Sequence, residues 1–515
     1  MAMRVTNKMM TNNLLSNING NKNALNKIDE QYATGLKIQR PSDDPIVAVR
    51  ALKLRTNLSE LNQYYERNIP DAFSWMDVTE GALTEINDIL TKIHTYCVQG
   101  STDTLTEKDR NDIVETLSEL KQQIYQEGSA NYAGRYVFSG YKTDTNLIFD
   151  EDTTRYQYNI TEPVEGTKID IFKKADNCVS LESYDAQAPE DFEIEDMPNV
   201  TNGYRIRLAY DDLDIDENGD AIITIQLPTK DADGNYEYDD DGNMIMEDFD
   251  VTVNTVNSLD PNAYKVTDEG TVNFISDTGE LILSEDIYLE LKDEELINIS
   301  YQKSRFDKNE LRPEHYFDCI KTDLVDENVE PVEYTKQNQQ ISYEINFNQK
   351  MVINTQGSDA ISHDMGRMID DILSSVDAVI ECQKQITEVE KMIADPAATS
   401  EQLTALNKLK EALDSEYSIK TSVMQDTFSK SLTETEKQQD YVNAAVADLG
   451  ARYVRLQLTE SRLSSEQVDF EDLLSSNEDA DLVETVVKYN AQETIYNAAL
   501  SAASKAVQNT LLDFL

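Results

Sequence analysis

The sequence is poor in positive charge and in histidine. It has 45 Lys and Arg against 98 Asp and Glu, a net charge of -53, and only three histidines. Because phosphate groups are bound by clusters of Lys and Arg, this balance argues against nucleic acid and against anionic membrane surfaces as partners. His94, His315 and His363 have no neighbour at metal-ligand spacing, so each is expected to be a surface or packing residue.

Cysteine is scarce too, and long apolar runs are missing. Cys97, Cys178, Cys319 and Cys382 are widely separated and form no C-x-x-C pair, which predicts free thiols. No stretch approaches the roughly 20 apolar residues of a membrane span. The N-terminus lacks the apolar core of a secretory signal, so composition alone indicates a cytoplasmic protein.

The sequence also lacks the common catalytic motifs. No G-x-S-x-G, P-loop or Rossmann glycine pattern occurs, so we expect neither an enzyme nor a bound cofactor. The sharpest chemical candidate is a calcium loop with Asp214, Asp216 and Asn218 as ligands. Its twelfth position is Ile225, where a bidentate Glu is needed, and a similar run at 239–242 matches less well. Both runs can equally be acidic hairpin turns.

What the sequence has is helical periodicity at both ends. Near the start, apolar residues recur at steps of three and four, namely Leu14, Ile18, Leu25, Ile28 and Tyr32. After a break at 35–45, Asp44 and Pro45 predict a new helix start. An apolar heptad seam then runs from Val47 to Ile93, and Pro70 should kink that helix near 68–69. Thr106 is the predicted cap of the following helix.

The C-terminal part repeats this pattern. An apolar stripe runs from Ile369 to Ile393, and a second runs from Val442 to Leu474. Thr399 with Gln402 predicts a capping box between them. The segment 475–481 interrupts the pattern, and Ser476 with Asp479 could cap the last helix. That helix places a row of apolar residues on one predicted seam, namely Leu482, Val486, Tyr489, Tyr496, Leu500, Ala503 and Val507.

The middle of the chain has a period of two and is strongly acidic. Residues 141–360 contain 52 acidic and 17 basic residues, a net charge of -35. Apolar and polar residues alternate at 249–255 and 341–347, which is typical of strands. Asn-Gly and Asp-Gly pairs predict tight turns at 202–203, 218–219, 233–234 and 241–242.

These patterns predict an α+β fold, in which long N- and C-terminal helices pair as a coiled-coil-like rod around an inserted antiparallel β region. We expect three parts: terminal helices at 1–34 plus 480–515, a helical rod at 35–140 plus 360–479, and an acidic insertion at 141–359. The terminal helices would be marginal alone, so their partner should be a neighbouring subunit. The predicted assembly residues are Leu14, Ile18, Leu25, Ile28, Leu482, Val486, Tyr489, Tyr496, Leu500 and Val507.

Several motifs resemble one protein family. Met3–Met10, Ala33–Pro45, Tyr136–Gly140 and the segments from Leu449 to Asp481 and from Leu511 to Leu515 are similar to flagellar hook-filament junction proteins of the FlgL type. Filament flagellin shares this architecture and is the alternative. Flagellins usually have A-K-D-D-A-A-G where this chain has Arg40–Pro45, and they rarely end in L-L-D-F-L, so both differences favour the junction protein.

The resemblance implies a location and partners that composition does not. Such hook-associated proteins are exported through the flagellar channel without a cleaved signal, which replaces the cytoplasmic expectation with an extracellular one. They assemble as a ring, and their partners are further copies of themselves, the neighbouring hook-associated protein, flagellin and an export chaperone. The acidic insertion lies outside the resemblance, and a binding module there is a second alternative.

Overall fold

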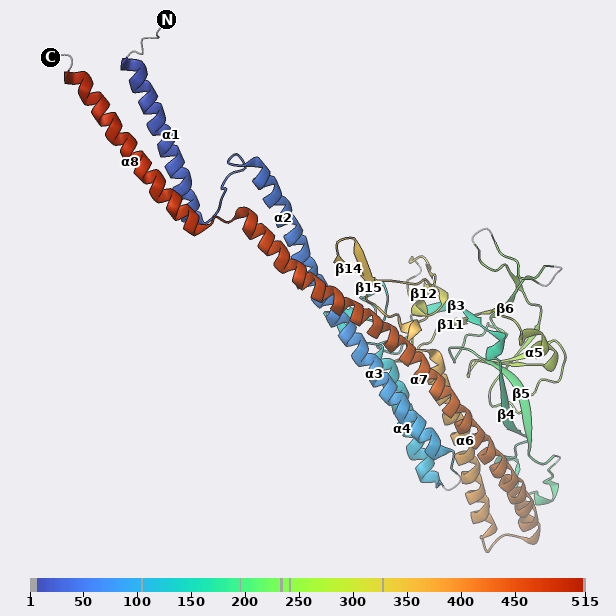
Figure 1. Cartoon of the computed structure of the whole chain (residues 1–515). Coiled ribbons are helices and arrows are strands. Elements are labelled where there is room, and N and C mark those ends of the chain that lie inside the picture. The colour runs from blue at the N-terminus through green and yellow to red at the C-terminus, as the bar shows by residue number, and fades with distance from the viewer. Residues whose placement is uncertain are drawn as a thin grey trace. The chain divides into compact units, whose positions relative to one another are not determined.

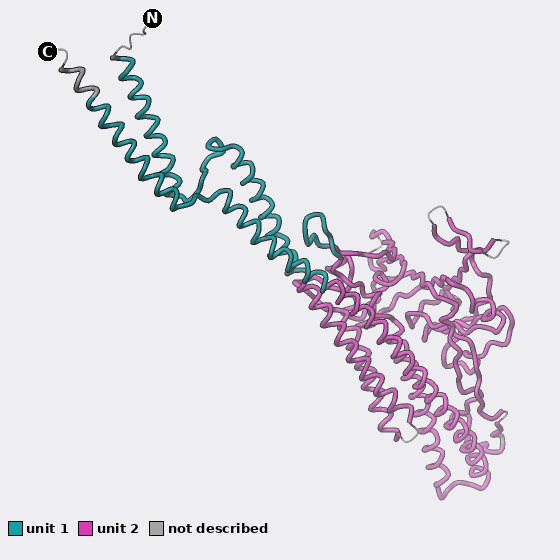
Figure 2. Tube along the Cα trace, in the orientation of Figure 1, with its two compact units in different colours: residues 1–72, 343–351, 454–515 teal, residues 73–342, 352–453 magenta. Residues whose placement is uncertain are grey.

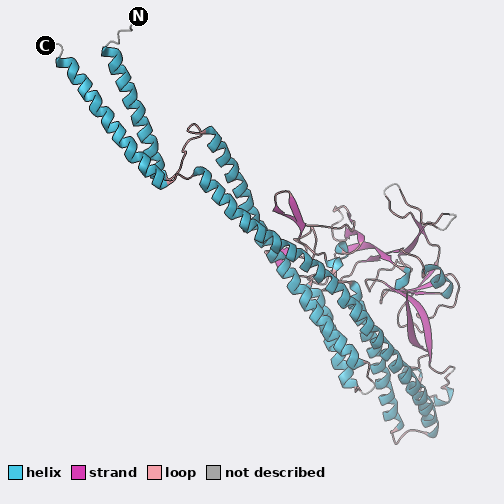
Figure 3. Ribbon diagram, in the orientation of Figure 1, coloured by secondary structure: helices cyan, strands magenta, loops and turns pink. Residues whose placement is uncertain are grey.

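The structure is a computed structural model that describes residues 7–102, 105–194, 196–231, 235–239, 242–326 and 328–512. It has two compact units (Figure 2). Unit 1 contains residues 1–72, 343–351 and 454–515, and unit 2 contains residues 73–342 and 352–453. Long helices come from both ends of the chain and the strands from its middle, which confirms the predicted α+β class (Figures 1 and 3). The three-part division remains a prediction.

Unit 1 is built mainly from helices of both chain ends. It contains α1 (Asn7–Thr34), α2 (Pro45–Gln63), the C-terminal part of α7 (Ser400–Glu478) and α8 (Leu482–Leu512). The β14–β15 hairpin (Ser342–Asn346 and Gln349–Val352) lies mostly in this unit. As predicted, Asp44 caps α2, because its carboxylate accepts the backbone N–H groups of Ile46 and Val47.

Pro70 was predicted to kink the helix, and the structure has a π-helical turn just before it. Residues Tyr64–Asn68 form a π-helical turn between α2 and α3 (Ile69–Gly100), and the N–H of Ile69 donates to the carbonyl of Tyr64. Proline has no N–H for the usual helical bond, and its ring crowds the carbonyl four residues earlier. A π turn directly before it is one way to accommodate both effects without ending the helix.

In unit 2 the helices of the two chain halves pack together again. The unit contains residues 73–100 of α3, α4 (Glu107–Glu127), α6 (His363–Ile393) and residues 400–453 of α7. The rings of Phe73 and Tyr453 lie 4.8 Å apart and join α3 to α7. The predicted caps are confirmed: Thr106 forms a capping box with Asp109, and Thr399 forms one with Gln402.

The strands of unit 2 form two larger sheets and a short hairpin. The five-stranded sheet has the order β4 (Asp170–Asp176), β5 (Asn199–Arg207), β10 (Glu280–Leu283), β9 (Thr271–Ile275) and β8 (Thr252–Val256). The six-stranded sheet has the order β13 (Val332–Tyr334), β12 (Asp318–Asp323), β3 (Tyr156–Val164), β11 (Ile297–Lys303), β6 (Ile223–Pro228) and β7 (Met246–Asp248). The hairpin pairs β1 (Asn131–Tyr132) with β2 (Arg135–Tyr136). The pairings are antiparallel except for β8 with β9, which is parallel.

One apolar core serves both larger sheets. Ile160 and Ile299 of one sheet and Ile206 and Phe274 of the other belong to the same buried cluster, together with Ile287 of the short helix α5 (Glu285–Leu291). The two sheets therefore belong to one hydrophobic core and should not fold separately.

Two of the predicted tight turns have different outcomes. Gly219 has a φ of +89°, so the turn at 218–219 is confirmed. The pair Asn202–Gly203 was predicted to be a turn, and this prediction is wrong because both residues lie inside strand β5. The ring of Phe172 on the neighbouring strand comes within 2.6 Å of where a Cβ of Gly203 would stand. Glycine is therefore needed there for close packing and not for a turn.

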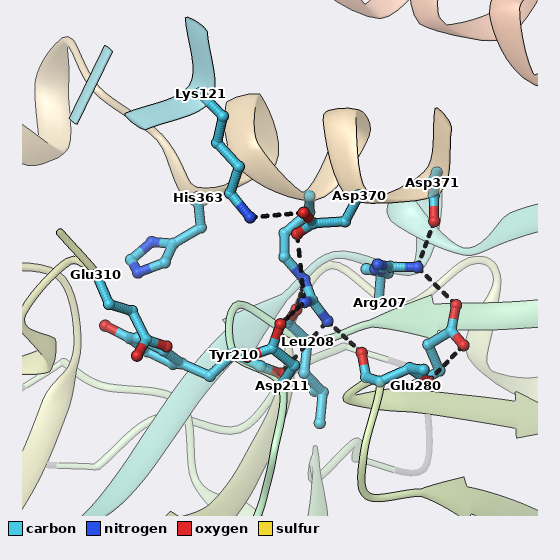
Figure 4. A network of polar contacts seen from close by, with 12 residues as sticks. Lys121, Arg207, Leu208, Tyr210, Asp211, Glu280, Glu310, His363, Asp370 and Asp371 are labelled. Atoms are coloured by element: carbon cyan, nitrogen blue, oxygen red, sulfur yellow. Dashed lines mark hydrogen bonds and ion pairs between the residues drawn. The ribbon is translucent and has the colours of Figure 1, made fainter. Parts of the chain in front are cut away.

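A buried ionic network fixes helix α6 to the five-stranded sheet (Figure 4). Arg207 of β5 lies 2.7 Å from the carboxylate of Glu280 on β10, and it also contacts Asp371 of α6. Burial opposes ionisation, but Arg207 and Arg205 hold the pKa of Glu280 below its ordinary value. The helices and the acidic strands of unit 2 are thus joined by charges that would be costly to separate.

Candidate assembly surface

The terminal helices α1 and α8 have well-defined boundaries. Helix α1 ends where Gly35 adopts a φ of +73°, and the N–H of Gly35 donates to the carbonyl of Gln31. Helix α8 begins after Asp481, whose carboxylate accepts the N–H groups of Val483 and Glu484 at 2.9 and 3.1 Å. Asp481, at the edge of the predicted interruption, is therefore the cap.

The prediction that Ser476 with Asp479 caps α8 is wrong. Residue Ser476 still belongs to α7, which continues to Glu478. The carboxylate of Asp479 instead accepts the hydroxyl of Ser475, four residues earlier. The predicted interruption at 475–481 thus shrinks to residues 479–481, and the two long helices are separated by three residues.

Helices α1 and α8 lie side by side and run antiparallel (Figure 1). The rings of Tyr32 and Tyr489 lie 6.3 Å apart, and the amide of Gln492 donates to the carbonyl of Asn21. The side chains that are partly or fully buried recur at steps of three and four on each helix. They are Leu14, Ile18, Asn21, Leu25, Ile28 and Gln31 on α1, and Thr485, Tyr489, Gln492, Tyr496, Ala499 and Ala503 on α8. We call this set the inner seam.

The α1–α8 pair leaves much apolar surface in water. From Lys8 to Thr34, no side chain of α1 is fully buried. On α8 a second set of apolar side chains is exposed, and we call it the outer strip: Leu482, Val483, Val486, Val487, Ile495 and Leu500. Val483 is 76% exposed and Leu500 is 41% exposed. Exposed apolar side chains on a helix are a typical surface for contact with another helix.

The structure divides the predicted assembly residues between these two surfaces. Leu14, Ile18, Leu25 and Ile28 lie in the inner seam with Tyr489 and Tyr496. Leu482, Val486 and Leu500 do not share that seam but belong to the outer strip. The side chain of Val507 lies outside the described residues, as do Met3 and the C-terminal Leu515 of the family motifs.

Sequence reasoning missed half of the inner seam on α8. Thr485, Gln492 and Ala499 were not predicted because they are polar or small. Their spacing from Tyr489 and Tyr496 is the signal that could have identified them, since all of them fall in one heptad frame.

The two linkers at the base of this pair are bonded to each other. The N–H of Lys37 donates to the carbonyl of Glu478 at 2.6 Å, and the N–H of Ala480 donates to the carbonyl of Gly35 at 2.7 Å. Arg55 of α2 lies 2.6 Å from the carboxylate of Glu478. These contacts join residues 35–37, which follow α1, to residues 478–480, which precede α8.

The candidate calcium residues use their oxygens within the protein. Asp216 accepts the N–H groups of Asn218 and Asp220, and these bonds lower its pKa. Asp214 instead accepts from the side chains of Gln157 and Ser304. No group of three His, Cys, Asp or Glu suited to a metal occurs in the described ranges. This arrangement favours the hairpin-turn interpretation.

Two of the histidines and three of the cysteines are buried packing residues in the described part of the chain. His363 lies among the rings of Tyr210, Tyr316 and Phe317, and burial together with Arg367 lowers its pKa to about 3. Burial likewise lowers the pKa of His315 to about 4. Cys97, Cys319 and Cys382 are buried free thiols, and Cys178 is an exposed one.

None of the described helices combines the length and apolar character needed to span a bilayer.

Comparison of the sequence with known proteins finds similarity to bacterial flagellar proteins. Residues 5–143 match the family model of the bacterial flagellin N-terminal helical region. The chain is 36% identical over 122 residues to a flagellin of Clostridium tyrobutyricum, covering 24% of this chain and 32% of the relative. It is 28% identical over 172 residues to flagellar hook-associated protein 3 of Salmonella typhimurium, covering 32% of this chain and 53% of the relative.

The chain therefore spans at most about half the length of these two curated relatives. Among solved structures, a flagellar hook-associated protein from Vibrio parahaemolyticus covers 85% of this chain and is itself fully covered, with 11% identity and a TM-score of 0.34. The family-model match and the matches to curated relatives confirm the resemblance to flagellar proteins that the motifs predicted.

Proposed function

We propose that this chain is a structural subunit of the bacterial flagellum that joins the hook to the filament. It is exported without a cleaved signal and assembles outside the cell as a ring. The similarity to hook-associated protein 3 supports this role, and so does the match of residues 5–143 to the flagellin N-terminal region. The function is mechanical, and the chain needs neither a catalytic group nor a cofactor for it.

The observation that carries this proposal is the outer strip of α8. The helix pair α1–α8 is held by its inner seam, yet the apolar side chains of the outer strip stay in water. Burying apolar surface contributes roughly 25 cal/mol per Å², so such a strip favours association. Its occupant is a helix from a second copy of this chain, because a ring repeats the same contact at every subunit.

The two faces of such a ring, one toward the hook and one toward the filament, need partners as well. At one end we propose the neighbouring hook-associated protein, at the other flagellin, and before export a chaperone that covers the terminal helices. The acidic insertion at 141–359 then forms the outer part of the ring. Residues 141–360 carry a net charge of -35, and such charges repel one another unless they are spread into solvent and screened beyond about 8 Å.

Filament flagellin is the second candidate. The sequence identity to this chain is higher for the flagellin of Clostridium tyrobutyricum than for hook-associated protein 3, although it extends over a shorter stretch. The two functions differ in where the subunit lies: a junction protein occupies one short band, and a flagellin fills the whole filament.

Cryo-electron microscopy of native flagella tests the choice. Gold-labelled antibodies against the acidic insertion should mark one band where hook meets filament, and a strain lacking this chain should carry hooks without filaments. Restoring the gene should restore both. Label along the entire filament would identify the chain as flagellin, and unchanged flagella in the deletion strain would refute both functions.

A further inference from the structure

Unit 2 contains a cavity of about 420 Å³ that no part of the proposed function uses. One wall is formed by residues 338–340, 352, 354–356 and 359, and the other wall is formed by α7. The α7 residues Ala445, Asp448 and Arg452 line it at steps of three and four, so they share one face of the helix. The volume lies within the range of about 300–1,000 Å³ that small-ligand sites have.

The cavity walls are held rigid by their own hydrogen bonds. Buried Asn354 accepts the N–H of Ile341 at 2.7 Å and donates to the carbonyl of Gln339 at 2.8 Å. Arg452 donates to the carbonyl of Asn354 at 2.7 Å and to the hydroxyl of Thr355 at 3.0 Å. Because these groups are fixed before any ligand arrives, a ligand would not have to order them.

Other polar groups of the cavity remain available. Within the described part of the chain, the side-chain amide of Gln340 and the amide NH₂ groups of Asn338 and Gln339 have no hydrogen-bond partner. The carboxylate of Asp359 is exposed and accepts a long hydrogen bond, 3.5 Å, from the hydroxyl of Ser358. Donors and acceptors are thus presented together along one wall.

Two exposed tyrosines flank this wall. Tyr141 is 64% exposed; its N–H donates to the side chain of Gln339, and its hydroxyl donates to the carbonyl of Gln340. Tyr441 lies one helical turn before Ala445 on α7, and its hydroxyl donates to the carbonyl of Ser358. Each ring offers an apolar face beside the polar wall.

The lining excludes several classes of ligand. Val352 and Ala445 are its only apolar members, which is too little for a lipid or an aromatic ligand. Its one cation, Arg452, already pairs with Asp448 at 2.7 Å, which argues against a phosphate. Its two carboxylates belong to no metal-binding group in the described ranges. What remains is a neutral ligand that both donates and accepts hydrogen bonds.

We propose that this cavity is a binding site for a neutral oligosaccharide. Sugar hydroxyls both donate and accept, so they match the amides of Gln340 and Asn338 and the carboxylate of Asp359. The C–H face of a pyranose ring is apolar and matches the ring of Tyr441. The site does not depend on ring assembly, so it can be tested on the monomer.

Isothermal titration calorimetry on the full-length monomer tests the proposal, with maltotriose and N,N′,N″-triacetylchitotriose as probes. At least one trisaccharide should bind. Gln340→Ala, Asp359→Ala and Tyr441→Ala should each weaken binding about tenfold, as expected for one lost contact. Tyr441→Phe keeps the ring and should retain most of the affinity. Gln340 and Asp359 are exposed, so their variants should fold normally.

The matched control is Asn111→Ala, which removes an exposed amide on α4, far from the cavity lining in sequence and absent from it. This variant should bind like the wild type. The proposal is overturned if neither trisaccharide binds, or if the cavity variants bind as tightly as the control does.

Discussion

The guanidinium of Arg367 lies 3.0 Å from the carboxylate of Asp211, although Arg367 belongs to the first turns of α6 and Asp211 follows strand β5. Arg367 also donates to the backbone carbonyls of Leu208, Tyr210 and Thr278. One almost fully buried side chain therefore satisfies acceptors from two separate segments of the acidic region.

Replacing Arg367 by Ala should destabilise unit 2 strongly. The change leaves three backbone carbonyls without this donor and leaves the Asp211 carboxylate with Lys303 alone, so we expect a loss of about 3–5 kcal/mol. Urea unfolding followed by circular dichroism measures it. Arg305→Ala is the matched control, because Arg305 is 63% exposed and its pair with Asp212 should contribute less than about 1 kcal/mol. Equal losses in the two variants would contradict the role given to Arg367.

Glu162 should make stability depend on pH. Its carboxyl is buried and accepts the N–H of Ala209 and the hydroxyl of Tyr301. Burial raises its pKa from 4.5 to about 7. The folded protein therefore holds a proton that the unfolded chain has lost, and the stability from this group is complete below about pH 4.5 and disappears as the pH rises through about 7.

The variant Glu162→Gln mimics the protonated form at every pH. We expect the wild type to lose roughly 1–3 kcal/mol relative to this variant between about pH 4.5 and pH 8. Thermal or urea unfolding across that range measures the difference. Glu285→Gln alters an exposed carboxylate on α5 and should give a nearly constant difference. A Glu162→Gln difference that is equally flat would show that Glu162 is ionised in the folded state.

Asp481 should control how stably α8 begins. Asp481→Ala removes the acceptor for two backbone N–H groups, and loss of an N-cap costs about 0.5–2 kcal/mol. Hydrogen exchange in the first turns of α8 should become faster by the corresponding factor. Asp479→Ala is the control, since the sequence pattern favoured Asp479 as part of the cap, and it should leave this exchange nearly unchanged. If Asp479→Ala speeds exchange there and Asp481→Ala does not, the assigned cap is wrong.

Local patterns in the sequence were reliable where neighbouring residues decide the structure. The caps at Asp44 and Thr106 depend on contacts within a few residues, and both are confirmed. The side chains of the seam from Val47 to Ile93 are buried or partly buried, as their period predicted. The predicted cap at Ser476 failed because distant residues extend α7 to its last turn. Arg55 and Lys37 both bond Glu478. Both partners are distant from Glu478 in the sequence, so a local pattern does not predict these contacts.

Tertiary packing also explains the other differences. The Asn202–Gly203 pair is a strong turn signal by itself, but the ring of Phe172 needs a residue without a side chain at that point in the sheet. The apolar residues of α8 were assigned to one seam, yet Tyr489 is partly buried and Leu500 is exposed. A periodicity shows which residues share a face, but it does not show which face meets the chain itself and which meets a neighbour.

The substitution Leu500→Asp tests the central proposal most directly. Leu500 is 41% exposed in the isolated chain, so the monomer should unfold at the wild-type temperature. In a ring, the new carboxylate would be buried without a partner, which is unfavourable by several kcal/mol at each contact. The matched control is Leu289→Asp, which makes the same change at an exposed residue of α5.

The decisive measurement is the amount of flagellin in the medium, with electron microscopy of the cells that export each variant. We predict that Leu500→Asp cells secrete the variant protein, carry hooks without filaments and release flagellin, whereas Leu289→Asp cells build normal filaments. Normal filaments and normal swimming in the Leu500→Asp strain would show that the outer strip is not the surface on which this chain assembles.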